Sequence, residues 1–279
     1  MFIKENHMLT TQQLQDIEKL QKEVETHDGL QLKLNWEMLR ARESDQLDFL
    51  HYENEELIAF LGLYSFGSTA EVTGMVKPSG RRKGYFTQLF IDAMAVAKQI
   101  DYKKILLNAS ASSNAAKEFL KKQGAIYKFS EHQMQWQPQL LEVSNGFTLR
   151  PATEEDIEMR IRLDLEAFGI PREDALATES RIDGDEDTDM LMIDVNDETI
   201  GKIRVKREDG QAWIYGFSIL PEHQGKGIGR KVLRHIVKQQ SEAGHSVHLE
   251  VETKNAHALS LYESVGFKVV HAQDYYVYE

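Results

Sequence analysis

The fold of this chain is decided by Ile219-Leu220-Pro221-Glu222-His223-Gln224-Gly225-Lys226-Gly227-Ile228-Gly229-Arg230. The segment before it, 212–220, is apolar, aromatic and β-branched, and predicts a strand that ends at Pro221, because proline cannot donate to a continuing ladder. Apolar residues at helical spacing from Val232 predict a helix that begins near Gly229. Backbone NH groups at a helix start lack partners, and small residues let an anion approach them. The stretch therefore predicts a diphosphate site, with positive charge added by Lys226 and Arg230.

Two common nucleotide-binding turns do not match this spacing. The phosphate loop of nucleotide hydrolases needs Lys and then Ser or Thr after its last glycine, whereas Gly229 is followed by Arg230-Lys231-Val232. A dinucleotide-binding turn needs Gly-x-Gly-x-x-Gly, whereas this chain has Gly225-x-Gly227-x-Gly229. Taken alone, the stretch also fits a flexible turn that binds nothing.

Two further motifs follow the glycine turn. They are His248-Leu249-Glu250-Val251 and Asn255-x-x-Ala258-x-x-Leu261-Tyr262-x-x-x-Gly266-Phe267. In this order after Gln224-x-x-Gly227-x-Gly229, they resemble the GNAT superfamily of acyl-CoA-dependent N-acyltransferases. The resemblance covers residues 147–279 and includes the opening segment 149–157. It implies an α/β (α+β) fold and acetyl-CoA as co-substrate of an N-acetyltransferase that modifies a primary amine.

The first half of the chain repeats these landmarks. Pro78 and Gly84 lie 143 positions before Pro221 and Gly227, and Gly124 lies 142 positions before Gly266. The shared offset predicts two tandem GNAT-like domains, residues 1–138 and 147–279, joined by a polar linker over 137–146. Each domain is expected to hold a mixed, largely antiparallel sheet flanked by helices. The predicted helices cover 14–24, 157–168 (capped by Thr153) and 256–265, and the predicted strands cover 47–52, 57–66, 70–76, 190–195, 199–206, 211–220 and 247–252.

Tyr262 is the candidate general acid. When an amine attacks a thioester, the departing CoA thiolate needs a proton, which a phenol that is neutral at pH 7 can give. The resemblance implies this role for the tyrosine of the motif. The alternative is a tyrosine whose ring only packs in its helix.

Glu250 is the candidate general base. Side chains alternate along its strand, so Glu250 shares a polar face with His248 and Glu252, opposite Val247, Leu249 and Val251. Glu250 would take a proton from the incoming ammonium, directly or through water. The alternative is a carboxylate that faces solvent or pairs with a cation. Trp213 occupies the position where many relatives carry a glutamate base, which shifts this role toward Glu250.

The remaining site residues follow from the resemblance. The backbone near Phe217 would run beside pantetheine, and a main-chain NH there would polarise the thioester carbonyl. Asn255 would hydrogen-bond the pantetheine arm, cap the next helix, or do both. The predicted cofactor-binding residues are Phe217, Ser218, Ile219, Gln224, Gly225, Lys226, Gly227, Ile228, Gly229, Arg230 and Asn255.

The first domain departs from the pattern. Phe86 replaces the third glycine, and Leu120, which cannot protonate a thiolate, stands where Tyr262 stands. Glu71 lies near the family's alternative base position. These changes favour a degenerate domain, which braces the active half or lines its acceptor cleft, over a second working site. Arg81-Arg82-Lys83 is too short a basic run to predict nucleic-acid binding in an acidic protein.

Composition excludes several other classes of chemistry. The chain has no cysteine, which excludes disulfides and a Cys-bound acyl intermediate, and its histidines show no metal-ligand spacing, so we expect no metal. The longest apolar run, 57–64, is too short to span a bilayer, so we expect a cytoplasmic protein without a membrane partner.

The formal net charge is −12, and the acidic segment 183–189 would attract a cationic small-molecule or peptide amine. That segment is equally explained as a solvated loop.

Three functional hypotheses remain open at this stage. The first is direct acetyl transfer from acetyl-CoA to an amine by the second domain. The second is a non-catalytic protein that binds acyl-CoA or a partner, which the altered first half favours. The third is a GNAT-like transferase that uses another acyl donor or forms an amide on a small thiol or a cell-wall precursor.

Overall fold

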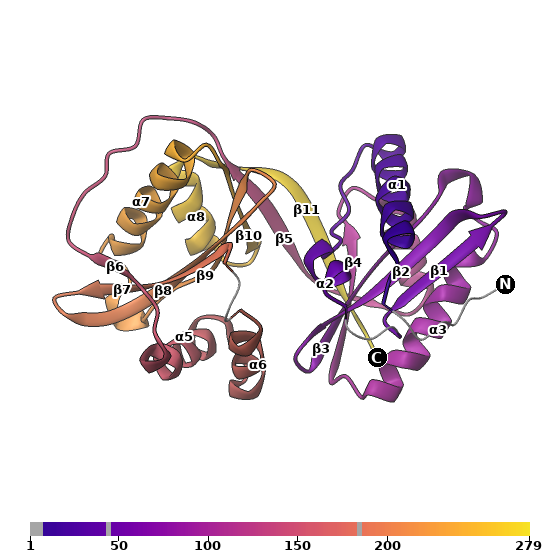
Figure 1. Ribbon diagram of the computed structural model, residues 1–279, viewed down its shortest axis with the longest axis horizontal. Helices are drawn as coiled ribbons and strands as arrows, with labels where there is room; N and C mark the ends of the chain where they lie inside the picture. The colour runs from indigo at the N-terminus through magenta and orange to yellow at the C-terminus, as the bar shows by residue number, and fades with distance from the viewer. Residues whose placement is uncertain (1–7, 43–45, 183–185) are drawn as a thin grey trace. The chain divides into compact units, whose positions relative to one another are not determined.

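The computed structural model describes residues 8–42, 46–182 and 186–279 (Figure 1). Contacts between Cα atoms divide the chain into two compact units. Unit 1 comprises Met1–Ser130 together with His271–Glu279, and unit 2 comprises Glu131–Val270. Within the described ranges, no helix is long and apolar enough to span a bilayer.

Unit 1 is a sheet with helices on both faces. Alternate side chains of its second strand are buried on opposite sides: Ala59 and Leu61 pack against α3, whereas Phe60 packs near α1. The strand order is β1-β2-β3-β4-β11-β5, and β3 and β4 are parallel. The elements are α1 (Thr11–Asp28), α2 (Trp36–Arg40), β1 (Asp48–Glu53), β2 (Glu56–Phe66), β3 (Thr69–Val76), the 3-10 helix η1 (Pro78–Gly80), α3 (Tyr85–Ile100), β4 (Lys104–Ser110), α4 (Asn114–Lys122) and β5 (Ile126–Trp136).

Unit 2 repeats this plan with its own core. Its strand order is β11-β5-β10-β9-β8-β7-β6, in which β9 and β10 are parallel. Apolar side chains of β8, β9 and β10 pack against α7 and α8 in one cluster. The elements are β6 (Thr148–Pro151), η2 (Glu154–Asp156), α5 (Ile157–Phe168), α6 (Arg172–Ile182), β7 (Thr188–Val195), β8 (Glu198–Glu208), β9 (Gln211–Ile219), η3 (Pro221–His223), α7 (Ile228–Glu242), β10 (Ser246–Glu252), α8 (Ala256–Val265) and β11 (Phe267–Tyr278).

The predicted fold class is confirmed, with a mixed and largely antiparallel sheet flanked by helices in each unit. The predicted helices 157–168 and 256–265 are α5 and α8. The strands predicted over 47–52 and 57–66 are β1 and β2, which pair antiparallel around a turn at Asn54 and Glu55, both at positive φ. Helices α2 and α6 are short or weakly amphipathic, and the periodicity of the sequence did not predict them.

Two strands contribute to both units. Residues 131–135 of β5 pair with β10 in unit 2, whereas Gln273–Tyr278 of β11 pair with Ile105–Ser110 of β4 in unit 1. In unit 1, Tyr275 is buried and stacks on Phe129 with ring centroids 4.7 Å apart. The compact units are therefore not the two contiguous segments expected from the sequence. Residues 137–147 form no helix or strand, which agrees with the expected linker.

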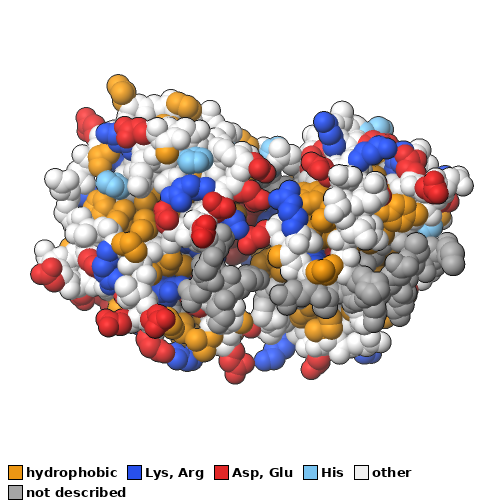
Figure 2. Space-filling view, in the orientation of Figure 1, with side chains coloured by type: hydrophobic (Ala, Val, Ile, Leu, Met, Phe, Trp, Pro, Cys, Tyr) orange, Lys and Arg blue, Asp and Glu red, His pale blue; other side chains and the backbone are white. Residues whose placement is uncertain are grey.

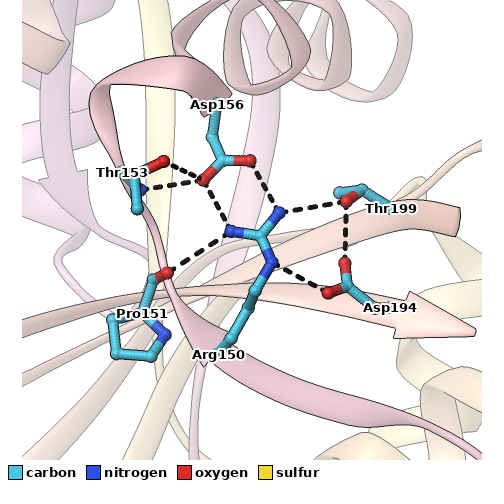
Figure 3. A network of polar contacts seen from close by, with 6 residues as sticks. All are labelled: Arg150, Pro151, Thr153, Asp156, Asp194 and Thr199. Atoms are coloured by element: carbon cyan, nitrogen blue, oxygen red, sulfur yellow. Dashed lines mark hydrogen bonds and ion pairs between the residues drawn. The ribbon is translucent and has the colours of Figure 1, made fainter. Parts of the chain in front are cut away.

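Arg150 ties the first strand of unit 2 to the elements that follow it (Figure 3). Its guanidinium donates to both carboxylate oxygens of Asp156 at 2.7 Å, and its Nε donates to Asp194 at 2.8 Å. Thr199 accepts from the guanidinium at 3.1 Å and donates to Asp194 at 2.7 Å. Asp156 also accepts the backbone NH of Thr153 at 2.8 Å, which completes a capping box at the predicted cap. The network joins β6, η2, β7 and β8.

Asp156→Asn is expected to lower the free energy of unfolding by about 1–2 kcal/mol at pH 7, a figure discounted for the partly exposed Arg150. The hydrogen bonds from Arg150 hold the pKa of Asp156 at about 2, below its usual value of 3.8. A lowered carboxyl pKa gives stability that is full above about pH 4 and is lost as the pH falls toward 2. The free energy of unfolding of the variant, measured with urea, should therefore not show this part of the decrease as the pH falls. The exposed neighbour Glu155→Gln is the control, and equal acid dependence in Asp156→Asn and the parent would contradict the assignment.

Candidate active site

The glycine turn of unit 2 lies between β9 and α7. Gly225 and Gly227 have φ of 74° and 78°, in the left-handed region that disfavours side chains. Gly227 is the N-cap of α7, a 15-residue helix that begins at Ile228. Lys226 and Arg230 are exposed, and Arg230 donates to Ser264 at 3.1 Å. The strand, turn and helix follow in the predicted order, and unpaired NH groups at the helix start suit an anion.

The three glycines are not equivalent. A Cβ on Gly229 would meet Ile219, Leu261 and Phe217 at 3.5–3.6 Å, which is ordinary contact, and its φ is helical. These contacts also show that the turn, the end of β9 and the residue before Tyr262 lie together. Space therefore permits alanine at Gly229, whereas backbone conformation disfavours it at Gly227.

Gly227→Ala and Gly229→Ala should change stability in opposite directions. Alanine at the left-handed Gly227 is expected to cost about 1–2 kcal/mol. Alanine inside the first turn of α7 is expected to add roughly 0.5 kcal/mol, because glycine is a poor helix former. Urea unfolding of both variants measures this pair. A loss of equal size at both positions would contradict it.

Gln224 closes the turn. Its Nε2 donates to the carbonyl of Ile219, the last residue of β9, at 2.7 Å. In unit 1, Arg81 Nε donates to the carbonyl of Val76, the last residue of β3, at 3.2 Å. Gln224 and Arg81 are 143 positions apart, as are the two carbonyls. This shared bond explains a long polar side chain at the first position of both turns, a role that sequence reasoning missed.

A β-bulge marks the strand that was predicted to run beside pantetheine. Lys202 pairs with Ser218 and Arg204 pairs with Tyr215, so two residues of β9, Gly216 and Phe217, oppose one residue of β8. Gly216 has φ of 55°. The parallel pairing of β9 with β10 ends just before this bulge, at Ile214 and Leu249. The bulge therefore turns backbone groups away from the ladder where the two strands separate.

Glu250 is the first residue of β10 beyond this pairing. It is half-buried and lies in register with Gln133 of β5. His248, which shares this face of β10, is only 7% exposed. His248 stacks on Trp213 of the neighbouring strand with ring centroids 4.9 Å apart. Aromatic rings therefore stand beside Glu250 on its face of the sheet.

Burial lowers the pKa of His248, which keeps its imidazole neutral at physiological pH. Its Nε2 lies 2.9 Å from Ser246 Oγ, and its Nδ1 has no hydrogen-bond partner in the described part of the chain. Trp213 also stacks on Tyr215, over which Arg204 lies at 4.9 Å. The alternation of side chains in the sequence placed His248 on the polar face of its strand and did not predict this stack. The sequence does not show that β9 pairs with β10, which is what places Trp213 beside His248.

Tyr262 lies on α8 with its ring in the core of unit 2. Its side chain is 8% exposed, its ring meets Phe267 edge to face, and burial raises its pKa to about 12. A buried ring and a neutral phenol occur together, so packing and proton donation are compatible roles. Asn255 caps α8 by accepting from Ala258 N at 3.0 Å, as one of its two expected roles requires.

Buried charges hold α5 and α6 against β8. Lys202 Nζ lies 2.7 Å from Asp164 and 3.8 Å from Glu179, which also pairs with Arg160. All four side chains are less than 10% exposed, and burial lowers the pKa of Lys202. No motif in the sequence predicted this cluster of buried charges. It fixes two helices on the face of the sheet that carries Glu250.

The acidic segment 183–189 is only partly described, since Asp183 and Asp185 lie outside the described residues. Asp189 pairs with Arg207. On the face shown in Figure 2, acidic and basic side chains intermingle without forming one continuous acidic surface. The described part of the segment is thus partly neutralised and gives little support to a cationic acceptor.

Unit 1 presents different residues at the same structural positions. The parallel pairing of β3 with β4 ends at Val72 and Leu107. These residues correspond to Ile214 and Leu249, where the pairing of β9 with β10 ends in unit 2. Asn108 therefore takes the place of Glu250. Ser113 caps α4 as Asn255 caps α8, which places Leu120 at the position of Tyr262. The pairing of β2 with β3 runs without a register shift, so this strand has no bulge. The bulge adds one residue to β9, which explains why the sequence offset between the two repeats rises from 142 to 143 at the turns.

Comparisons with known proteins agree with this architecture. Residues 11–125 and 157–267 match the model of the Acetyltransferase (GNAT) family. The [ribosomal protein bS18]-alanine N-acetyltransferase of Escherichia coli K12 is 36% identical over 58 residues, which span 20% of this chain and 39% of that protein.

Two solved structures are similar over the whole chain. One is the GCN5-related N-acetyltransferase from Sphaerobacter thermophilus, with a TM-score of 0.80 at 20% identity, covering 100% of this chain and 95% of that chain. The other is a tandem GNAT protein from the clavulanic acid biosynthesis pathway, with a TM-score of 0.73 at 14% identity, covering 100% and 98%. The predicted tandem fold is thereby confirmed.

Proposed function

Because the chain belongs to the acetyltransferase (GNAT) family, we propose that unit 2 transfers an acetyl group from acetyl-CoA directly to a primary amine. The observation that carries this proposal is the convergence at one end of unit 2 of the glycine turn, the bulged end of β9 and the residue next to Tyr262. Each part supplies one requirement of acyl transfer from a thioester: anion binding, carbonyl polarisation and a proton donor.

The residues of unit 2 suit each part of the donor. The NH groups at the start of α7, with Lys226 and Arg230, would hold the diphosphate. Phe217, Ser218 and Ile219 would supply backbone groups to the pantetheine arm and the thioester carbonyl. Among the cofactor residues predicted from the sequence, Gln224 and Asn255 act by closing the turn and capping α8, which shapes the site.

Two side chains of unit 2 would move protons in the reaction. Glu250 takes a proton from the ammonium, directly or through water, and leaves a nucleophilic amine. The amine nitrogen attacks the thioester carbon, the carbon–sulfur bond breaks, and Tyr262 gives its proton to the departing thiolate. The new amide nitrogen loses its second proton to solvent, and the proton held by Glu250 returns through solvent to the tyrosinate, so both side chains regain their starting states. The high pKa of Tyr262 keeps it protonated until sulfur leaves.

Unit 1 is proposed as a degenerate domain that does not catalyse transfer. Leu120 has no proton to give, and the amide of Asn108 cannot act as a base at the position of Glu250. The unbroken register of β3 also means that no bulge turns a backbone NH toward a carbonyl. Three separate requirements of the reaction are thus missing from one unit.

The acceptor is proposed to be a small-molecule or peptide amine. The relative from Escherichia coli is named for acetylating an alanine of a ribosomal protein, which makes a peptide α-amine one acceptor to test. Polyamines and aminoglycosides are the cationic alternatives. Release of free thiol should be followed with acetyl-CoA, propionyl-CoA and succinyl-CoA against such a panel.

Each outcome of this assay separates the hypotheses. Amine-dependent thiol release with acetyl-CoA supports the proposal. Release only with another acyl-CoA assigns a different donor. Binding of CoA without release for any amine would instead identify a non-catalytic acyl-CoA-binding protein.

A further inference from the structure

The helix that carries Tyr262 ends in a buried carbonyl group. Val265 is the last residue of α8 and is fully buried. The last carbonyls of a helix have no partner inside the helix, and a buried carbonyl without a donor is costly. Two side chains donate to the carbonyl of Val265: Trp136 Nε1 at 3.0 Å and Gln139 Nε2 at 2.6 Å. The end of α8 is thus held by residues that are distant in the sequence.

A backbone hydrogen bond adds to this hold. The backbone NH of Gln137 donates to the carbonyl of Gly266 at 3.0 Å, and the NH of Gly266 donates in turn to carbonyls in the last turn of α8. We call Trp136, Gln137 and Gln139 the α8 clamp. Trp136 ends β5, is 7% exposed, and belongs to the same buried cluster as Tyr262. The clamp is therefore anchored in the core of unit 2.

Gly266 makes room for the α8 clamp. A Cβ on Gly266 would lie 2.1 Å from Gln139 Nε2 and 3.2 Å from Trp136 Nε1. Its φ of 107° also disfavours any other residue. The glycine that precedes Phe267 in the motif is thus explained by the close approach of two donors to the end of α8.

The corresponding end of α4 in unit 1 is built differently. Gly124 and Tyr278 are the counterparts of Gly266 and Trp136, since both pairs are 142 positions apart. Apart from its chain neighbours, no atom of the described residues lies within 4 Å of a Cβ built on Gly124. The ring of Tyr278 meets Phe90 of α3 edge to face, with centroids 5.2 Å apart. Open space thus accompanies the helix with a leucine, and the α8 clamp accompanies the helix with the candidate proton donor.

Tyr262 lies on the side of α8 that the clamp holds. Tyr262 and Val265 are three positions apart, so they are neighbours on one face of the helix, and both are buried. A shift of the end of α8 would therefore move the ring of Tyr262. A proton donor must lie within hydrogen-bond reach of the departing sulfur, and a misplacement of about 1 Å can slow a reaction by about 10²-fold.

We propose that Trp136 and Gln139 are positioning residues for Tyr262, and that their hydrogen bonds to Val265 hold its hydroxyl where the thiolate departs. This inference rests on the proposed function of unit 2. Neither side chain gives or takes a proton in the reaction. Because β5 follows α4 in the chain, the first repeat of the sequence supplies the residue that aligns the proton donor of the second.

Trp136→Phe removes the indole donor and keeps an aromatic ring in the core. Turnover at saturating acetyl-CoA should fall by about 10- to 100-fold, with little change in KM for acetyl-CoA. Trp36→Phe is the matched control, because Trp36 Nε1 donates to Gln21 at 2.8 Å in unit 1 and its loss should leave turnover as it was. Gln139→Ala removes the second donor at an exposed residue and should slow turnover by a smaller factor. This variant keeps the test decisive if Trp136→Phe fails to fold.

A double-mutant cycle separates positioning from a general loss of structure. If the clamp acts through Tyr262, then Trp136→Phe and Gln139→Ala should cost no further turnover in the Tyr262→Phe background. Losses that multiply in the double variants would overturn the inference and leave the proposed function intact.

A spectroscopic measurement tests the same hold without an acceptor. In the full chain labelled at the ζ carbon of tyrosine, the NMR signal of Tyr262 is identified by its loss in Tyr262→Phe. That signal should shift or broaden in Trp136→Phe and in Gln139→Ala, and should stay in place in Trp36→Phe. An unchanged signal in both clamp variants would overturn the inference. A shifted signal in a protein that transfers no acyl group to any amine would support the hold on Tyr262, while the proposed function fails.

Discussion

Replacing Tyr262 with phenylalanine is expected to lower the turnover of acetyl transfer by about 10²- to 10⁴-fold, with little change in CoA affinity. The phenylalanine ring fills the same buried space and keeps the edge-to-face contact with Phe267. The variant therefore removes the proton donor and preserves the packing of α8. Single-turnover rates and a CoA titration measure the two effects separately.

Tyr127→Phe is the control for this substitution. Tyr127 is exposed in unit 1, and its hydroxyl lies 2.9 Å from Ser130 Oγ. Its loss should leave turnover as it was. If Tyr262→Phe turns over at the parental rate, the tyrosine is a packing residue and the thiolate takes its proton from elsewhere.

Replacing Glu250 with glutamine is expected to lower turnover by about 10²-fold or more, because the amide keeps the shape of the side chain but cannot accept a proton from an ammonium. Glu252→Gln is a matched control on the same strand and the same face, two residues nearer the exposed end. The comparison should be made at saturating acetyl-CoA with the best amine of the panel. Equal losses in the two variants would mean that charge near the site matters rather than a base at Glu250.

The sequence was informative wherever a structural requirement is local. The glycine turn and the capped helix that carries Tyr262 each depend on a few consecutive residues, and both were predicted close to their observed bounds. The tandem repeat followed from the recurrence of such local signals at one offset. Fold class and the general place of the site were therefore accessible without coordinates.

Features that depend on strand pairing were not accessible. The bulge at Gly216 makes the offsets between the two repeats differ by one residue, but only the register of β8 with β9 shows where the bulge lies. The stack of His248 on Trp213 and the replacement of Glu250 by Asn108 likewise depend on which residues face each other across strands. The hydrogen bond from Trp136 to the end of α8 joins residues 129 positions apart, which leaves no mark in hydrophobic periodicity.

The shared strands have a consequence for the order in which the protein is made. In unit 1, β11 lies between β4 and β5, so a central place in the sheet of the first unit is filled by residues 271–279. Those residues leave the ribosome after all of unit 2, so until then the nascent first unit lacks the strand that lies between β4 and β5. The half of the molecule that is translated first is thus completed last, and a gene divided at the linker would encode a first half without its central strand.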